Sequence, residues 1–206
     1  MNDTYKNKTV LYLSFDIESD GPTPILNNLL SIGICGITLQ EEIIFEFEKN
    51  IESLPNHFPD DECMKNFWLK PEQKKAFEYL QTNRHNYIEV FENLGLELKK
   101  LAEKYELVFV AYPSCFDWMF FKCYYELAKS NSKNKTNFYD ISYKCECSST
   151  LFDYYIKNNN LSSSESKKLF KHLGEVDPSS NHMALQDAIV QGKLYVKLLK
   201  KMITNI

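Results

Sequence analysis

Three segments typical of β-strands follow one another in the first quarter of the chain, and this order constrains the fold more than any other feature. Thr9–Ile17 and Leu29–Leu39 are rich in aliphatic and β-branched residues, which indicates buried strands. A Gly-Pro-Thr-Pro sequence between them predicts a turn. In Ile43–Glu48 apolar and acidic residues alternate, which is typical of an edge strand with one face in water. The chain therefore begins with a sheet.

The rest of the chain is predicted to be mostly helical, with one further buried strand at Leu107–Ala111. Apolar residues recur at intervals of three or four between Ile88 and Leu101, which is the period of an amphipathic helix. Further helices are expected at Glu72–Leu80, with Pro71 suited to the first helical position, and at Phe116–Ala128, Ser148–Lys157 and Ser164–Leu173. The last helix is expected to run from a cap in Pro178–Asn181 to about Met202, and the polar run Lys129–Thr136 is expected to be a loop. This succession predicts a mixed α/β fold with one core, organised as a single domain over residues 1–206.

Length and composition fit a globular protein outside the membrane. The chain has 206 residues, of which 44% are hydrophobic and 25% charged. No apolar run approaches the ~20 residues of a membrane helix, and the polar segment Met1–Lys8 does not resemble a secretory signal. The six cysteines include no C-x-x-C pair, so we expect reduced thiols. A cytoplasmic, intracellular protein with no membrane contact is expected.

The charge balance restricts how the protein could handle nucleic acid. The net charge is −4, with 28 acidic and 24 basic residues, which argues against a protein that coats nucleic acid electrostatically. An enzyme that acts on one strand end remains compatible, because bound divalent cations invert the local charge. Arg84 is the only arginine, so phosphate contacts must come from lysine, backbone amides or metal.

Acidic residues stand at three points where the predicted elements begin or end. Asp16 and Glu18 lie two residues apart at the end of the first strand, so both side chains leave the same face. Such a pair is costly unless it is solvated or neutralised by a cation. Asp117 follows a buried strand at a helix start, where the helix dipole alone would also favour an acid. Asp187 lies in the last helix between the small residues Ala184 and Ala188, which permit close packing.

His182 precedes Asp187 by five residues, which fixes how both could reach one site. Five helical residues rotate by roughly 500°, leaving the two side chains about 140° apart. His182 can therefore approach only from the segment entering the helix; alone, it would be a polar cap. Together with the acids it predicts a site at one end of the sheet. Oxygen ligands select Mg²⁺ or Mn²⁺ over zinc, and several carboxylates suit a two-metal phosphodiester hydrolase.

The order and spacing of these residues resemble the DEDDh exonucleases of the RNase H-like superfamily. Phe15–Glu18 matches the first motif, Phe116-Asp117 the second, and His182–Asp187 the third. Residues 16–24, 67–72 and 182–192 are similar to a branch of small stand-alone proteins, the mycobacterial-type 3′-5′ exoribonuclease domain. Members of that branch commonly carry an acid where this chain has Gln186, which is not a metal ligand in the family pattern.

The resemblance implies an RNase H-like exonuclease fold, with a mixed central sheet and helices on both faces. It implies two divalent cations, Mg²⁺ or Mn²⁺: Asp16, Glu18 and Asp187 bind the ion that activates water, and Asp16 and Asp117 serve the second. It further implies that Glu18 and His182 are the catalytic residues, with His182 as the base.

The resemblance also implies a substrate. It is the 3′ end of single-stranded RNA or DNA, with RNA favoured, degraded to 5′-mononucleotides. The 3′-terminal nucleotide is expected against the loop Gly21–Leu29, with Phe116 or Trp118 available for packing or stacking. Trp68 is more typical of the core. Pairing of two copies is implied as well, since related stand-alone members often pair.

Other classes fit less well. A haloacid-dehalogenase-like phosphatase requires a second aspartate two residues after Asp16 and then Thr or Val, whereas the chain has Glu18 and Ser19. A proofreading fragment of a B-family polymerase places tyrosine where this chain has His182. A binding module that keeps the nuclease fold without turnover stays open, and metal-dependent release of mononucleotides distinguishes it from an enzyme.

Overall fold

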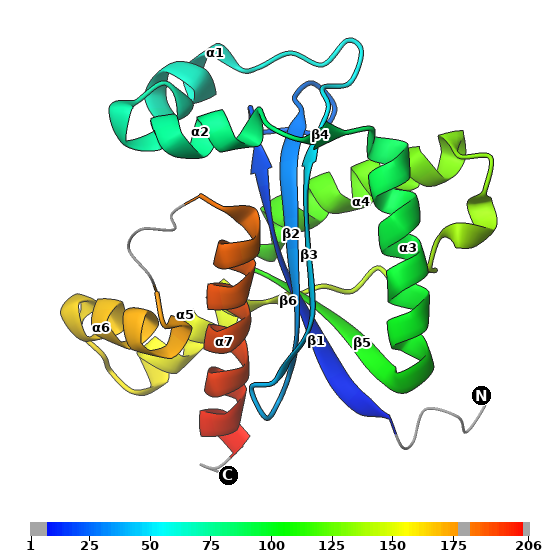
Figure 1. Cartoon of the computed structure of the whole chain (residues 1–206). Helices are drawn as coiled ribbons and strands as arrows, with labels where there is room; N and C mark the ends of the chain where they lie inside the picture. Colours follow the sequence, from blue (N-terminus) through cyan, green and yellow to red (C-terminus); the bar gives the residue numbers. More distant parts are fainter. Residues whose placement is uncertain (1–7, 177–181, 204–206) are drawn as a thin grey trace.

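A mixed β-sheet forms the centre of the molecule in the computed structural model, which describes residues 8–176 and 182–203 (Figure 1). Its strand order in the described residues is β4-β3-β2-β1-β5-β6. The strands are β1 (Thr9–Ser19), β2 (Leu29–Thr38), β3 (Ile43–Ile51), β4 (Arg84–His85), β5 (Tyr105–Ala111) and β6 (Glu146–Cys147). The first three form an antiparallel meander, while β5 runs parallel to β1.

Helices cover both faces of this sheet (Figure 1). On one face lie α3 (Tyr87–Lys104) and α4 (Ser114–Asn131). On the other lies α7 (Ala184–Ile203), against which α5 (Ser148–Asn158) and α6 (Ser163–Gly174) pack. The short elements α1 (Asp61–Cys63), the π-helical η2 (Met64–Trp68), the 3-10 turn η3 (Pro71–Gln73) and α2 (Lys74–Leu80) lie beyond one end of the sheet, and a second 3-10 turn, η4, spans Lys135–Asn137. None of the described helices is long and apolar enough to cross a membrane.

Alternation along β1 separates the core from the side of the sheet that carries the acids. Leu11, Leu13, Phe15 and Ile17 are buried in the large core that includes α3 and α4. Burial of each such side chain contributes about 1.5–3 kcal/mol. The intervening residues lie on the opposite face, toward α7. Asp16 and Glu18 belong to this second set, so the packing that buries the core also directs both carboxylates toward α7.

Gly33 on β2 lets the start of α7 lie directly on the sheet. It pairs with Asp16 on one side and with Glu48 of β3 on the other. A Cβ atom at position 33 would lie 2.1 Å from the backbone nitrogen of Leu185 and 2.2 Å from the carbonyl carbon of Ala184. No larger residue fits there without moving the helix, so Gly33 sets how closely α7 approaches the acids of β1.

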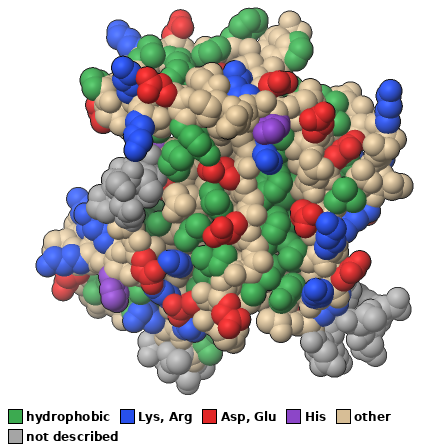
Figure 2. Space-filling view, in the orientation of Figure 1, with side chains coloured by type: hydrophobic (Ala, Val, Ile, Leu, Met, Phe, Trp, Pro, Cys, Tyr) green, Lys and Arg blue, Asp and Glu red, His purple; other side chains and the backbone are tan. Residues whose placement is uncertain are grey.

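The outer edge of β3 is only partly covered. β4 pairs with β3 at Asn50 and Ile51 alone, so that among the described residues the edge from Ile43 to Lys49 has no neighbouring strand. Ile43 and Ile44 on this edge are 38% and 41% exposed. Figure 2 shows hydrophobic and acidic side chains exposed side by side on the front of the sheet, between α7 and α3.

The expected mixed α/β class is confirmed, as are the strands and the longer helices, with bounds that differ by a few residues. Two expectations need correction. Pro71 begins a 3-10 turn that leads into α2, not an α-helix. The expected loop Lys129–Thr136 is partly helical, because α4 continues to Asn131 and η4 begins at Lys135. The helix cap expected in Pro178–Asn181 lies outside the described residues.

Candidate active site

A pocket of about 380 Å³ opens where β1 ends and where α4 and α7 begin. Five residues singled out from the sequence line it: Asp16, Glu18, Asp117, His182 and Asp187. They come from three separate parts of the chain, and the strand order brings them together because β5, which precedes Asp117, is the neighbour of β1. The remaining wall is largely apolar and includes Phe116, Phe170 and Val190.

Gln191 binds Asp16 within this pocket. Its Nε2 atom donates a hydrogen bond of 2.7 Å to Asp16 Oδ1. Gln191 is buried, and its Oε1 atom has no hydrogen-bond partner in the described part of the chain. It lies one helical turn after Asp187, so both side chains leave the same face of α7. Gln191 was not predicted from the sequence, although its spacing of four from Asp187 is the signal that could have identified it.

Asp117 lies in the first turn of α4 and is only 3% exposed. Burial raises the pKa of its carboxyl group to about 8, although backbone hydrogen bonds from Ile17 and Tyr112 act in the opposite direction. Its Oδ2 atom is buried and has no hydrogen-bond partner among the described residues. A buried carboxylate oxygen without a donor is costly, so this atom is suited to binding a cation.

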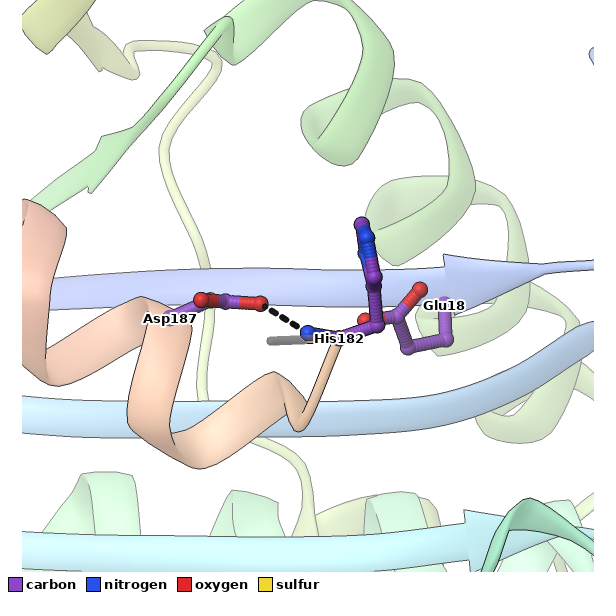
Figure 3. A group of neighbouring side chains, drawn as sticks. All are labelled: Glu18, His182 and Asp187. Atoms are coloured by element: carbon purple, nitrogen blue, oxygen red, sulfur yellow. Dashed lines mark hydrogen bonds between the residues drawn. The ribbon is translucent and has the colours of Figure 1, made fainter. Parts of the chain in front are cut away.

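His182 lies just before α7, with its backbone in the left-handed region at a φ of 60°. Histidine is enriched in this conformation among residues other than glycine. Its backbone N–H donates to Asp187 Oδ2 at 3.1 Å. The structure thus places His182 ahead of the helix, as its spacing from Asp187 requires. One ligand atom from each of Glu18, His182 and Asp187 lies within 4.8 Å of the others (Figure 3).

Two aromatic residues of η2 hold the His182 ring. Phe67 meets it edge-on, with ring centroids 4.8 Å apart, and Trp68 does so at 6.3 Å. Trp68 is 1% exposed, and its indole N–H donates to the carbonyl oxygen of Ser19, so it belongs to the core, as expected. Burial lowers the pKa of His182 below its usual value. The imidazole is therefore neutral at pH 7 and able to accept a proton.

Acidic groups dominate the electrostatics of the pocket. The pKa values of Asp16 and Glu18 are raised well above their usual range by burial and then by the neighbouring carboxylates. Burial also raises the pKa of Asp187, to about 6. Every charge that contributes to the four carboxyl pKa shifts is negative. The described lining of the pocket holds four carboxyl groups and no lysine or arginine, which fits hard divalent cations that prefer oxygen ligands.

Of the three residues expected to contact substrate, Phe116 lines the pocket, whereas Trp118 and Leu29 do not. Phe116 lines the pocket and also an adjoining cavity of about 490 Å³ between β1 and η2. Trp118 lies outside both and packs on Phe15 and Phe109, with ring centroids 6.0 Å and 5.5 Å away. Leu29 is at odds with its expected role: its side chain is fully buried in the core, and its backbone N–H donates to the Tyr124 hydroxyl. It cannot reach a substrate while the core is intact.

Solved structures share this fold, although no protein family and no curated protein matches the chain by sequence. The chain has the RNase H-like fold of the DEDDh 3′-exonucleases. It is similar to the nuclease domain of 3′hExo, a DEDDh family member bound to rAMP, with 16% identity, a TM-score of 0.57, and coverage of 98% of this chain and 95% of that one.

Two further structures show the same similarity. Cell-death related nuclease 4 matches with 16% identity and a TM-score of 0.53, over 96% of this chain and 64% of that one. E. coli exonuclease I in complex with single-stranded DNA matches with 13% identity and a TM-score of 0.60, over 96% of this chain but only 43% of its own. At this level of identity the similarity establishes the fold, and the chemistry must be argued from the pocket.

Proposed function

We propose that this protein is a metal-dependent 3′-5′ exonuclease, which hydrolyses single-stranded nucleic acid from its 3′ end and releases 5′-mononucleotides. The observation that carries the proposal is the meeting of four carboxylates and a neutral histidine in one pocket, at one end of a DEDDh-type sheet. The proposal includes one domain over residues 1–206 and two divalent cations, Mg²⁺ or Mn²⁺.

The carboxylates divide naturally between two ions. Asp16 is surrounded by the other three, since Asp117, Glu18 and Asp187 all raise its pKa, and this suits a ligand shared by both ions. Glu18 and Asp187 would complete one site, and Asp117, with its unpaired Oδ2 atom, the other. When bound, two such ions supply an activated water molecule and stabilise the charge on the leaving oxygen.

His182 would take the proton from the attacking water. Its ring is neutral near pH 7 because burial lowers its pKa, and its placement beside Glu18 and Asp187 brings it to the edge of the proposed metal site. Phe67 and Trp68 restrict the rotation of the ring. A base held in one orientation contributes typically 10²–10⁴-fold to the rate.

The substrate assignment rests on similarity and on the pocket wall. Structures with the same fold include a 3′-exonuclease that recognises the 3′ end of the histone mRNA stem-loop and exonuclease I with an oligonucleotide of thirteen thymidines. RNA is favoured here because the motifs resemble the small mycobacterial-type exoribonuclease branch. Phe116 is exposed to both cavities and would pack against the terminal nucleotide. We retain pairing of two copies as a further part of the proposal.

A cytoplasmic location also belongs to the proposal. All six cysteines are free thiols, as expected for a protein kept in a reducing compartment.

A nucleic-acid-binding module without turnover is the alternative. It has the same fold and would use the same pocket, so only chemistry separates the two. The carboxylates favour the enzyme, because a module that merely binds a polyanion gains nothing from four acids at its binding site.

The decisive experiment uses 5′-end-labelled single- and double-stranded RNA and DNA with Mg²⁺, Mn²⁺ or chelator. Stepwise shortening from the 3′ end, stopped by chelator or by a 3′-phosphate, is expected, with 5′-monophosphates as product. Binding without any shortening in either metal would favour the binding module. Cleavage of a circular single strand would instead indicate an endonuclease.

A further inference from the structure

The first turn of α7 lacks a local cap in the described residues, although it carries two residues of the proposed site. The α7 entrance, His182–Leu185, leads into a helix whose first N–H groups have no acceptor within the helix. An N-cap side chain usually accepts one of these bonds. Met183, the residue before the helix, has a thioether that accepts only weakly. Among the described residues, the acceptor comes from another part of the chain.

Glu48 of β3 supplies it. The backbone N–H of Leu185 donates to Glu48 Oε1 at 3.2 Å, across 137 positions of sequence. A carboxylate at this place also interacts favourably with the positive end of the helix dipole. The entrance is thus fastened to the sheet by a hydrogen bond to a carboxylate of β3.

The strand register explains how Glu48 reaches the helix. Asp16, Gly33 and Glu48 are direct neighbours in one row across β1, β2 and β3. Directly paired residues direct their side chains to the same face of a sheet. The α7 entrance rests on Gly33 in the middle of the row, where a Cβ would collide with Leu185. It is therefore held between a carboxylate of the proposed metal site and Glu48.

Tyr79 of α2 fixes the other oxygen of Glu48. Its hydroxyl group donates to Glu48 Oε2 at 2.7 Å. Burial, followed by the hydrogen bond to Glu48, raises the pKa of Tyr79 to about 12, so the hydroxyl keeps its proton. With both oxygens engaged, the Glu48 carboxylate has one orientation, and the helix start that it holds is fixed relative to β1.

We propose that Glu48 is a positioning residue for the nuclease reaction: it fixes the α7 entrance so that His182 and Asp187 stay in place beside Glu18. This inference rests on the proposed function, since it assigns a task to those two residues. Glu48 does not line the pocket, and it acts only through the helix. Mutation of a residue that hydrogen-bonds a metal ligand typically lowers affinity or activity by about 10–100-fold, and Glu48 acts one step further away, through the backbone of Leu185.

The test compares Glu48→Ala, Glu48→Gln and a matched control, Glu46→Ala. Glu46 lies on the same strand, two residues earlier, and is exposed. Three measurements are made: hydrogen exchange of residues 184–187, Mn²⁺ affinity, and kcat and KM on a single-stranded oligonucleotide. Hydrogen exchange and Mn²⁺ affinity both report on the position of the helix start in the folded protein. Well below the melting temperature, a general loss of stability would leave both measurements unchanged.

Glu48→Ala is expected to speed exchange at Leu185, weaken Mn²⁺ binding by about 10-fold or more, and lower kcat by about 10–100-fold with little change in KM. Glu48→Gln retains an acceptor for Leu185 and is expected to recover most of the loss, while Glu46→Ala behaves as wild type. Tyr79→Phe removes only the support of Glu48 and, should Glu48→Ala not fold, is expected to show the same pattern in weaker form.

The inference is overturned if Glu48→Ala, or Tyr79→Phe in its place, matches Glu46→Ala in exchange and in Mn²⁺ affinity. Equal losses in Glu48→Gln and Glu48→Ala would also overturn it, because the acceptor would then not be what matters. A wild type that neither binds Mn²⁺ nor shortens oligonucleotides would defeat the proposed function instead. Exchange at Leu185 would still decide whether Glu48 holds the helix.

Discussion

The carboxyl groups of Asp16, Glu18, Asp117 and Asp187 repel one another in the metal-free protein, and burial adds to the cost of ionising them. Replacing any one by its amide is expected to lower hydrolysis by about 100-fold or more, because cation binding weakens. The same change relieves repulsion, so the melting temperature without metal should rise, by about 2–4 °C for each kcal/mol gained. Oligonucleotide assays and calorimetry check both effects.

Asp140→Asn is the control for these variants, since Asp140 is 95% exposed and pairs with Lys129 away from the pocket. It should leave hydrolysis unchanged. A pocket variant that digests oligonucleotides at the wild-type rate would remove that residue from the proposed site.

His182 is expected to behave differently from the acids. His182→Ala should slow hydrolysis by about 10²–10⁴-fold while leaving Mn²⁺ affinity nearly intact. At saturating Mn²⁺, wild-type activity should fall as the pH drops through the lowered pKa of His182, because a protonated imidazole cannot accept a proton. The residual activity of the variant should lack that fall.

A nitrogen of His182 lies close enough to Glu18 and Asp187 to bind a metal with them, so the ligand role has to be tested directly. Mn²⁺ titration of His182→Ala beside Asp187→Asn does so. If both variants lose affinity equally, His182 is a ligand and the base must be another group.

Gln191 holds Asp16 through a single hydrogen bond. Gln191→Leu keeps the bulk of the side chain but removes the donor, so Asp16 becomes free to turn, and Mn²⁺ affinity is expected to fall by about 10–100-fold. Gln186→Leu, on the exposed side of the same helix, is the matched control. Unchanged affinity in Gln191→Leu would mean that the packing of β1 alone orients Asp16.

At the scale of elements, α6 is tied to α7 beside the pocket by Glu175. This residue ends α6 in the left-handed conformation, at a φ of 54°, and binds Lys193 and Lys197, each at 2.6 Å. These bonds lower the pKa of Glu175 to about 2, so they persist above that pH and are lost only as the pH falls toward it. Because the Glu175 side chain is 53% exposed, the contribution to global stability is small.

Glu175→Gln is therefore expected to speed hydrogen exchange in the last turn of α6 with little change in melting temperature. About 1 M salt, which shortens the screening length to about 3 Å, should do the same to the wild type only in part, since the paired atoms lie 2.6 Å apart. Exchange that responds to neither change would show that apolar packing, through Leu173, holds the two helices together.

The elements that could be predicted from the sequence are those in which apolar residues recur at a regular spacing. The alternation in β3 and the apolar spacing in α3 were enough to find them. The two-residue strands β4 and β6 have no such signal, since they exist only because β3 and β5 offer free edges beside them. The turn η2 is likewise fixed from outside, by the bond from Trp68 to Ser19.

The residues of the candidate site also fall into those that could be predicted from the sequence and those that could not. The motif residues could be found because each has a recognisable neighbourhood in sequence, and the structure brings all five to one pocket. Glu48 could not be found, because its place depends on the register of three strands and on the position of a distant helix. The position of Leu29 was mistaken for a related reason: the direction of its side chain depends on where β2 begins.

At the scale of the whole molecule, the metal-free protein is expected to lose stability as the pH rises from about 4 to about 8. Folded Asp187 and Asp117 retain protons up to pKa values of about 6 and 8, whereas the unfolded chain releases them near 4. A group whose pKa is higher in the folded state than in the unfolded state stabilises the fold. This stabilisation is complete at a pH below the unfolded pKa and is lost as the pH rises through the folded pKa. The lowered pKa of His182 makes stability rise with pH instead, but His182 is one group, whereas four carboxyl groups have raised pKa values.

Melting temperatures with chelator and with Mg²⁺ at several pH values check this. Mg²⁺ should stabilise the protein more at pH 7 than at pH 5, because cations replace the protons that the pocket has lost. Asp117→Asn should flatten the pH dependence of the chelated protein. A chelated wild type whose melting temperature rises steadily from pH 4 to 6 would mean that the pocket acids do not dominate its titration.

The uncovered edge of β3 bears on how copies of this molecule can meet. An exposed edge offers backbone groups to any strand that approaches it. Two copies joined there antiparallel about a twofold axis would face each other residue by residue. With the axis at Glu46, Phe47 or Glu48, a glutamate of one copy stands directly opposite a glutamate of the other. Like charges so placed are unfavourable. The residue that holds α7 in place thus also disfavours the growth of one sheet into the next, and the pairing of copies proposed above is expected to use a different surface.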